Sequence, residues 1–362
     1  MVSMQDVEWE ACLVPPRRNP ELEREIRKTW GTVPPMARFL THSPWLARRM
    51  AQGNFRHGQL AHIPIRLAEL VFLAVSQDKS CRYCFAGQRA SLRIQGFDEE
   101  RIRRVEQAFS SAEDDPRESL ALDYARRISQ SNPPPTAADR DALRQAGYSD
   151  EAIKEIAYMA SSTVGGNLIA TLPAVPIDDI EGIEDRWQVR LLRPFVARRL
   201  RSKERQGQPE FLPPELKTGP FAYVDLELDG LPAARVSRET IEAAWSSPIL
   251  SQRAKGLVFA VVARGLDSKR CEQEARRLLA PHGLDDGDVD EILSHLASPK
   301  LDPIEAAIVP FARETIRYRP ADIQRRARSL LEQLSVEQFM EFVGVVSQAN
   351  AICRRSLALC ED

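Results

Sequence analysis

Residues 67–75 read Leu-Ala-Glu-Leu-Val-Phe-Leu-Ala-Val, and this stretch decides the fold class. Together with the residues up to position 92, it is predicted to form helix whose first half is mostly buried. A single acid, Glu69, stands among the apolar residues. The simplest interpretation of Glu69 is a surface acid on an amphipathic helix. Because a buried acid needs a partner or a task, Glu69 is also a candidate functional residue.

Apolar residues recur at a spacing of three to four along most of the chain, as is typical of helices that bury one face. The segments with this pattern are 66–77, 99–109, 118–130, 138–146, 150–162, 253–266, 270–280, 286–296, 304–318, 320–333 and 335–349. Ser149 and Ser335 stand where a helix-capping side chain is expected. The pattern predicts an all-α fold.

One segment departs from the helical pattern. Residues 224–228 alternate between apolar and acidic side chains, and Asp229-Gly230 offers a tight turn. We therefore expect a short β-hairpin near 222–236, although Pro232 weakens the returning strand.

The chain also repeats itself. Residues 67–75 match residues 254–262, which read Ala-Lys-Gly-Leu-Val-Phe-Ala-Val-Val. Two later segments match in the same order and with similar spacing: 119–126 with 304–313, and 147–156 with 333–342. Agreement at three places predicts two tandem helical domains, 20–185 and 210–360, joined by a charge-rich linker at 186–209.

A Cys-x-x-Cys motif, Cys81-Arg82-Tyr83-Cys84, follows the first of these helices. Two thiols three residues apart on a helix can face each other, so they can close a disulfide or share one thiolate. Ser80 is expected to cap a helix with Cys81 in its first turn, where the helix dipole and the flanking Lys79 and Arg82 favour the thiolate. Glu69 is then a candidate general base.

The two copies differ at the positions where chemistry is expected. The equivalent pairs are Glu69 and Gly256, Cys81 and Ser268, and Cys84 and Cys271. The second domain therefore lacks the acid and one of the two thiols. We expect the chemistry in the first domain and a structural or regulatory role for the second.

Composition limits the partners and the compartment. The 362 residues carry 50 basic and 52 acidic side chains, so no nucleic-acid partner is expected. We expect no signal peptide and no membrane span, since no stretch approaches about 18 consecutive apolar residues. Six cysteines in a chain of this length do not make a disulfide scaffold, which favours a cytoplasmic location.

Neither a cofactor nor a metal ion is expected. Zinc would need two more cysteine or histidine ligands at suitable spacing, and Cys353 and Cys360 have no accompanying histidine pair. The chain shows no phosphate-binding glycine loop, no dinucleotide fingerprint and no nucleophile elbow.

Glu69, the Cys81–Cys84 motif and the Phe-Ala-Gly that follows it resemble the alkylhydroperoxidase-D-like, carboxymuconolactone decarboxylase superfamily. The stretch 149–156, followed by Asn167, is similar to that family too. The family usually shows Asn-Arg at this point, whereas this chain has Leu168 after Asn167 and, in the second copy, Cys353 before Arg354. The resemblance covers most of both copies and is most specific at 67–90.

The resemblance implies an all-α fold of packed helices that forms a homo-oligomer, with peroxidase or disulfide-reductase chemistry. It assigns Cys84 as the cysteine that attacks the peroxide, Cys81 as its resolving partner and Glu69 as the acid of the proton relay. A small hydroperoxide would be the substrate, and a lipoyl or thioredoxin-type dithiol would be the electron donor. The pocket is expected to be apolar, beside Phe72, Phe85 and Tyr158.

The relay departs from the family pattern. Gln88 stands where peroxidase members carry a histidine, and an amide cannot carry a proton at neutral pH. Tyr83 stands where some members have histidine, and with a pKa near ~10 it is a poorer shuttle. His57 and His62 precede the Glu69 helix and are candidates to replace the missing imidazole.

Three functions stay open at this point. The first is a thiol-dependent oxidoreductase centred on Cys81, Cys84 and Glu69. The second is a helical scaffold with weakened catalysis that serves assembly, ligand binding or redox sensing. The third is a specialised metabolic enzyme that uses the same pocket for another reaction.

Overall fold

The computed structural model describes residues 4–30, 33–52, 60–97, 99–108, 116–177 and 209–360. Over these residues the fold is all-α, as predicted, and the only β pairing among them is an isolated bridge between Glu210 and Gly230. Almost all of the predicted linker, residues 186–208, lies outside the described residues.

The first half of the chain supplies a series of helices that ends in a long one. These are α1 (Pro20–Trp30), α2 (Ala37–Leu40), α3 (Pro44–Ala51), α4 (Ile65–Asp78), α5 (Arg82–Ile94), α6 (Glu99–Ala108), α7 (Pro116–Gln130), α8 (Ala137–Gln145) and α9 (Asp150–Thr171). A 3-10 turn, η1 (Met4–Asp6), precedes them.

The second half also ends in its longest helix. Its helices are α11 (Ala222–Leu226), α12 (Pro232–Ser246), α13 (Gln252–Leu266), α14 (Lys269–Leu279), α15 (Asp286–His295), α16 (Pro303–Glu314), α17 (Pro320–Leu331) and α18 (Val336–Leu359). The 3-10 turns η4 (Pro214–Leu216) and η5 (Ala280–His282) belong to it.

The order α4 to α9 recurs in α13 to α18, and local geometry recurs with it. Cys81 begins α5 at φ −78° and ψ 93°, and Ser268 begins α14 at φ −85° and ψ 92°. The residue before each is left-handed, with φ 51° at Ser80 and 59° at Asp267. The capping predictions for the last helix of each series, Ser149 and Ser335, are confirmed.

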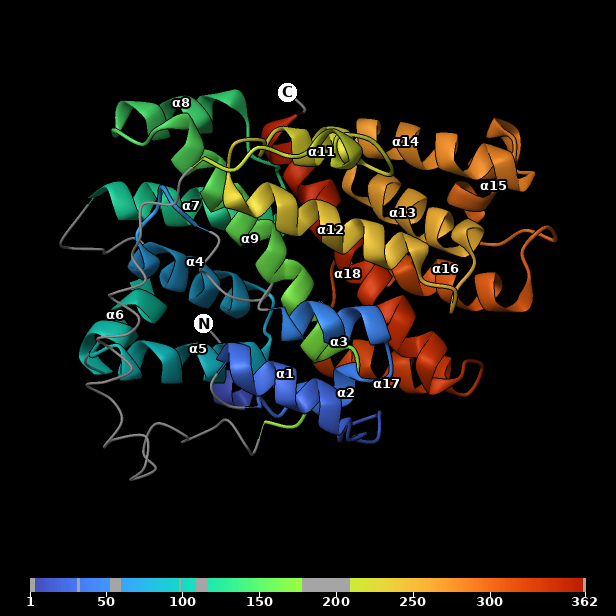
Figure 1. Ribbon diagram of the computed structural model, residues 1–362, viewed down its shortest axis with the longest axis horizontal. Coiled ribbons are helices and arrows are strands. Elements are labelled where there is room, and N and C mark those ends of the chain that lie inside the picture. The colour runs from blue at the N-terminus through green and yellow to red at the C-terminus, as the bar shows by residue number, and fades with distance from the viewer. Residues whose placement is uncertain are drawn as a thin grey trace.

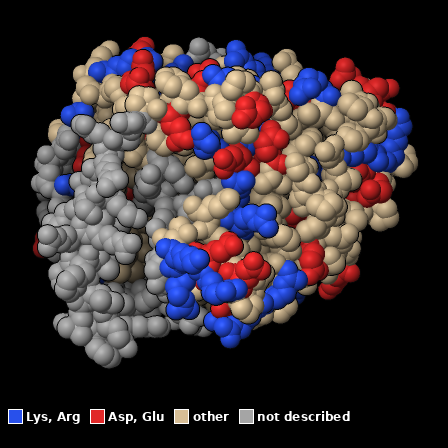
Figure 2. All heavy atoms as spheres, viewed as in Figure 1, with Lys and Arg blue, Asp and Glu red and all other residues tan. Residues whose placement is uncertain are grey.

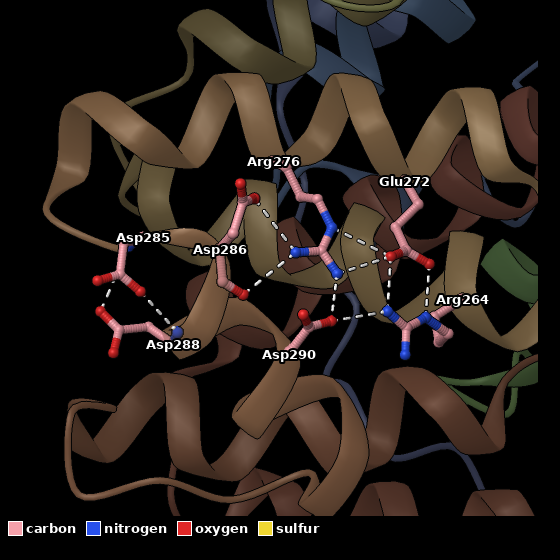
Figure 3. A network of polar contacts seen from close by, with 7 residues as sticks. All are labelled: Arg264, Glu272, Arg276, Asp285, Asp286, Asp288 and Asp290. Carbon is pink, nitrogen blue, oxygen red and sulfur yellow. Dashed lines mark hydrogen bonds and ion pairs between the residues drawn. The ribbon is translucent and has the colours of Figure 1, made fainter.

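Ion pairs on the outer face recur as well. Arg89 of α5 pairs with Glu99 of α6, and at the equivalent positions Arg276 of α14 pairs with Asp286 of α15 at 3.3 Å. Figure 3 shows how Arg276 also reaches Glu272 and Asp290, which Arg264 shares. These exposed arginines each have carboxylate partners close by.

Helices α9 and α18 pack against each other at the middle of the molecule, with α4 to α8 on one side and α13 to α16 on the other (Figure 1). One large core contains residues of α4, α7 and α9. The other joins α13, α16 and α18 to Trp45, Leu46 and Met50 of α3. Because α3 packs on the second half, the two cores do not divide the chain at a single point.

Two close approaches fix α18. Gly165 of α9 lies against the carbonyl of Ser347, and Gly344 lies against the indole of Trp45. The Trp45 Nε1–H donates to Glu341 at 2.7 Å, which holds the ring in place.

Gly344→Ala is expected to lower the free energy of unfolding by about 1–3 kcal/mol, the usual cost of overpacking. Its new methyl group would lie 2.5 Å from Cζ2 of Trp45. Gly166→Ala is the matched control, since nothing lies within 4 Å of its added methyl group. Urea unfolding should show that variant stabilised by about 0.5–1 kcal/mol, the gain of alanine over glycine in a helix. Equal effects at the two positions would contradict this packing.

The predicted hairpin near 222–236 is wrong. Residues 222–226 form α11, and Pro232 is the first residue of α12, where its fixed φ suits a helix start. Val224 and Leu228 are four residues apart and are both fully buried, whereas Leu226 is exposed. The apparent alternation was therefore one buried face of a helical turn.

Charges of both signs are interspersed over the described part of the face seen in Figure 2. Among the described residues, no helix combines the length and the apolar character that crossing a membrane requires.

Candidate functional site

The two motif cysteines lie at the tight connection between α4 and α5. Helix α4 ends at Asp78, and the left-handed Ser80 turns the chain so that the Cys81 N–H donates to the Ser76 carbonyl at 2.9 Å. Cys81 is itself the N-cap of α5. The expectation that Ser80 caps this helix was wrong by one residue, because the left-handed turn takes up that residue.

The two sulfurs face each other as free thiols. The backbone N–H of Cys84 donates to Cys81 Sγ at 3.4 Å, and the thiol of Cys84 also hydrogen-bonds the Cys81 sulfur. On its other side, Cys84 Sγ lies 3.9 Å from the carbonyl of Gly166 in α9. Cys81 is 0% exposed and Cys84 is 6% exposed. The geometry brings the pair together and leaves a narrow opening at Cys84 alone.

The environment makes the two thiols unequal. Burial disfavours ionisation of Cys81, but hydrogen bonds from the side chain and backbone of Cys84, together with the hydroxyl of Thr171, outweigh it and lower the pKa of Cys81. Burial raises the pKa of Cys84 well above its usual value, and its thiol bond to Cys81 raises it further. The first negative charge therefore belongs on Cys81, with the proton on Cys84.

Glu69 and Gln88, both predicted site residues, are in direct contact. The Gln88 Nε2 amide donates to the carboxylate of Glu69 and to its backbone carbonyl, the latter at 3.1 Å. Both side chains are buried. A carboxylate that accepts a bond from an amide is held in place, but the amide passes no proton onward.

The remaining predicted pocket residues divide between two places. Tyr83 packs in a small cluster with the two cysteines, Phe39 and Val175, and Phe72 borders both this cluster and the core of α4. Tyr158 lies elsewhere: it packs with residues 212–234, under the guanidinium of Arg355 at 5.8 Å from its ring centroid. Phe85 belongs to the α4 core.

Neither histidine candidate is placed at the thiols. His57 lies outside the described residues. The side chain of His62 is exposed, and its backbone N–H donates to the buried carboxylate of Glu155 at 2.7 Å. In the structure, residue 62 helps to hold the chain before α4.

Asn167, noted from the sequence, contributes by positioning. Its Oδ1 accepts from Ser76 Oγ at 3.2 Å, and its Nδ2 donates to the Val75 carbonyl at 3.4 Å. Because Ser76 in turn accepts from the backbone of Cys81, Asn167 fixes the connection that presents the thiols.

The sequence patterns did not indicate two further residues of this site, Thr171 and Tyr318. Thr171 at the end of α9 lies against the Cys81 thiol, and Tyr318, from the loop after α16, lies against Thr171. Burial raises the pKa of Tyr318, and negative charge at Cys81 raises it further. Within the described structure, neither hydroxyl meets the geometry of a hydrogen bond, although both are buried. Tyr318 comes from the second half of the chain, so no local motif indicated it.

Tyr318 also lines a surface hollow of about 360 Å³. Its other lining residues are Glu314, Arg317, Arg319, Asp322, Ile323 and Arg326. Tyr318 thus borders the hollow while its hydroxyl lies within reach of the charge on Cys81.

The equivalent place in the second half holds a different set of groups. Tyr223 Oη donates to Cys271 Sγ at 3.1 Å. Burial opposes ionisation of Cys271, but hydrogen bonds from Cys353, Ser268 and Tyr223 prevail and lower its pKa.

No cluster of three or more histidine, cysteine or acidic side chains suited to a metal ion occurs among the described residues. A scan of the sequence against protein-family models, a search of curated proteins and a search of solved structures each found no match.

Proposed function

We propose that this chain is a thiol-dependent oxidoreductase in which Cys81 and Cys84 cycle between dithiol and disulfide. One observation supports this more than any other: two adjoining free thiols at a helix start, one favoured as thiolate and the other as thiol. A nucleophilic sulfur needs to be ionised, and a resolving sulfur works best when it keeps its proton until the second step.

The proposed reaction with a hydroperoxide balances in two steps. The Cys81 thiolate attacks the terminal peroxide oxygen, the O–O bond breaks, and the alkoxide takes a proton to leave as an alcohol. The sulfur becomes a sulfenic acid. Cys84 then attacks that sulfur, and water leaves as the disulfide forms. A dithiol carrier of lipoyl or thioredoxin type returns two electrons and two protons.

This assignment reverses the roles that the family resemblance implies, in which Cys84 attacks. The hydrogen bonds that lower the pKa of Cys81 support attack by Cys81, whereas the slightly greater exposure of Cys84 favours contact with a reagent there. Either order gives the same disulfide. The resemblance at 67–90 supports the pair as the reacting unit, and a homo-oligomer in the cytoplasm is part of the same proposal.

The test is to add an organic hydroperoxide and follow the peptide containing residues 81–84 by mass spectrometry. The parent protein should lose two thiols within minutes and form one disulfide. Cys84→Ser should stop at a sulfenic acid on Cys81 that dimedone traps. Cys81→Ser should remain unlabelled.

Cys360→Ser is the matched control, because that half-buried thiol lies at the end of α18 and should leave the disulfide yield unchanged. If the Cys81→Ser variant instead forms a dimedone adduct on Cys84, then Cys84 is the cysteine that attacks the peroxide. If the parent keeps both thiols over hours, the oxidoreductase is excluded.

The burial of the pair favours a second candidate, a redox-sensing scaffold. Cys81 is 0% exposed, and the carboxylate of Glu69 already accepts a hydrogen bond from the Gln88 amide. Both features slow turnover. A single slow oxidation that changes the oligomeric state, without repeated turnover in the presence of a dithiol, would support this candidate over the enzyme.

A further inference from the structure

Arg354 of α18 is a buried cation that forms no ion pair with a carboxylate among the described residues. Its side chain is 0% exposed, and its Nη2 donates to the Ile316 carbonyl at 3.1 Å. Its Nε and Nη1 atoms, also buried, have no hydrogen-bond partner among the described residues. Burying a guanidinium without a counter-charge costs several kcal/mol. Burial also lowers the pKa of Arg354 to about 10.

The neighbouring arginine shows what the chain does elsewhere. Arg355 is equally buried, but it binds Asp225 and, at 2.7 Å, Ser237. Arg238, which is also buried, pairs with the same Asp225 at 2.8 Å. The less buried arginines in Figure 3, Arg264 and Arg276, have carboxylate partners too. Arg354 therefore departs from the pattern of the described chain.

Two more basic side chains, Lys79 and Arg317, belong to the same cluster of positive charge as Arg354. The positive charge of Arg354, after burial, is the main cause that lowers the pKa of Lys79, and Arg317 lowers it as well. The charge of Asp78 acts in the opposite direction on the pKa of Lys79, but this carboxylate is already paired with Arg126 at 2.9 Å and accepts from Ser129 at 3.0 Å. Because this acid is already paired, the three basic groups leave room for an anion.

A surface hollow lies beside part of this cluster. Arg317 lines the hollow and is exposed. The two acids in its wall are already paired, Glu314 with Arg326 at 2.7 Å and Asp322 with Arg325 at 2.6 Å. Tyr318 borders the hollow on one side, and its hydroxyl lies near both Arg354 and the Cys81 sulfur.

We propose that Arg354, Lys79 and Arg317 bind a small oxyanion, the carboxylate or phosphate end of a substrate whose reactive part lies at Cys81 and Cys84. The assignment of this anion as substrate rests on the proposed function. The oxyanion would accept hydrogen bonds from the two unpartnered nitrogens of Arg354. Tyr318 would lie between the anion and the thiols.

Binding is tested first, without any reaction. Calorimetric titration of the reduced full-length protein uses butyrate in one arm and inorganic phosphate in the other, at constant ionic strength set with chloride. We expect one of the two anions to bind at one site. Arg354→Gln should weaken that binding at least tenfold. Lys79→Gln should weaken it too, and this second variant keeps the test decisive if the first one folds poorly.

Arg277→Gln is the charge-matched control, since this exposed side chain is on α14, pairs with Glu274 and does not line the hollow. It should bind the anion as the parent does. If neither butyrate nor phosphate binds, or if Arg354→Gln binds as tightly as the parent, the anion site is excluded.

The link to the thiols is tested by comparing a hydroperoxide that carries a carboxylate with a neutral one of similar size. The kcat/KM of the parent should favour the carboxylate substrate at least tenfold, and Arg354→Gln should remove this preference. If the anion binds but the thiols do not react, the proposed oxidoreductase function is refuted and the anion site stands. Reactive thiols without a preference would refute the anion as substrate and keep the oxidoreductase.

Discussion

Asp225→Asn is expected to lower the free energy of unfolding by about 3–5 kcal/mol, the cost of breaking a buried ion pair by removing one partner. Asp225 of α11 is fully buried and serves three donors: Arg238 of α12, Arg355 of α18 and the hydroxyl of Ser237. An amide has nearly the same shape, so the variant removes charge while it keeps the volume. Arg355 then loses its carboxylate partner, and Arg238 keeps only the partly exposed Glu242.

The measurement is urea unfolding at neutral pH, followed by circular dichroism. Asp229→Asn is the matched control, because its ion pair with Lys217 is partly exposed and surface pairs contribute about 0.2–1 kcal/mol. Similar losses in the two variants would show that Asp225 does not hold α11 and α12 to α18.

This triad also explains how much of the fold the sequence could predict. The alternation of apolar and acidic residues at 224–228 predicts a strand, with Asp225 as one of its acids. In fact the buried carboxylate of Asp225 joins three helices, and Val224 and Leu228 fill the core beside it. Over so short a stretch, apolar residues two apart in a strand and four apart in a helix fall on the same positions. Periodicity alone could therefore not decide between strand and helix. Longer segments, such as α4 and α13, were predicted correctly because several turns agree.

The site was predictable only as far as its local sequence reaches. The packing of α4 and α5 brings Cys81 to Cys84 and, separately, Glu69 to Gln88, all four of them residues that the sequence indicates. Thr171, Tyr318 and Arg354 come from later helices and loops, and the packing of α9 on α18 brings them in. Aligning the two halves compares equivalent positions, and it says nothing about contacts between one half and the other.

Gln88→His is expected to raise the rate of hydroperoxide consumption by about a hundredfold, the lower end of the range for a positioned acid–base group. Gln88 already donates to the carboxylate of Glu69, so an imidazole at this position would keep that bond with one ring nitrogen. The other nitrogen could then exchange protons, which the amide cannot do.

The rate should also acquire a new pH dependence. A neighbouring carboxylate favours the imidazolium and raises the pKa of an imidazole, so the added rate should appear as pH rises and neutral histidine forms to act as base. Stopped-flow measurements from pH 5 to 9 on the parent and the variant would show this difference.

Gln95→His is the control for this prediction. It lies at the far end of the same helix, where Gln95 bonds Ser91, and it should change neither the rate nor its pH profile. Glu69→Gln in the Gln88→His background should lose most of the gain, because the imidazole would no longer be oriented by a carboxylate. A Gln88→His variant that folds and reacts at the parent rate would show that proton transfer through this pair does not limit the reaction, and that access to the buried sulfurs does.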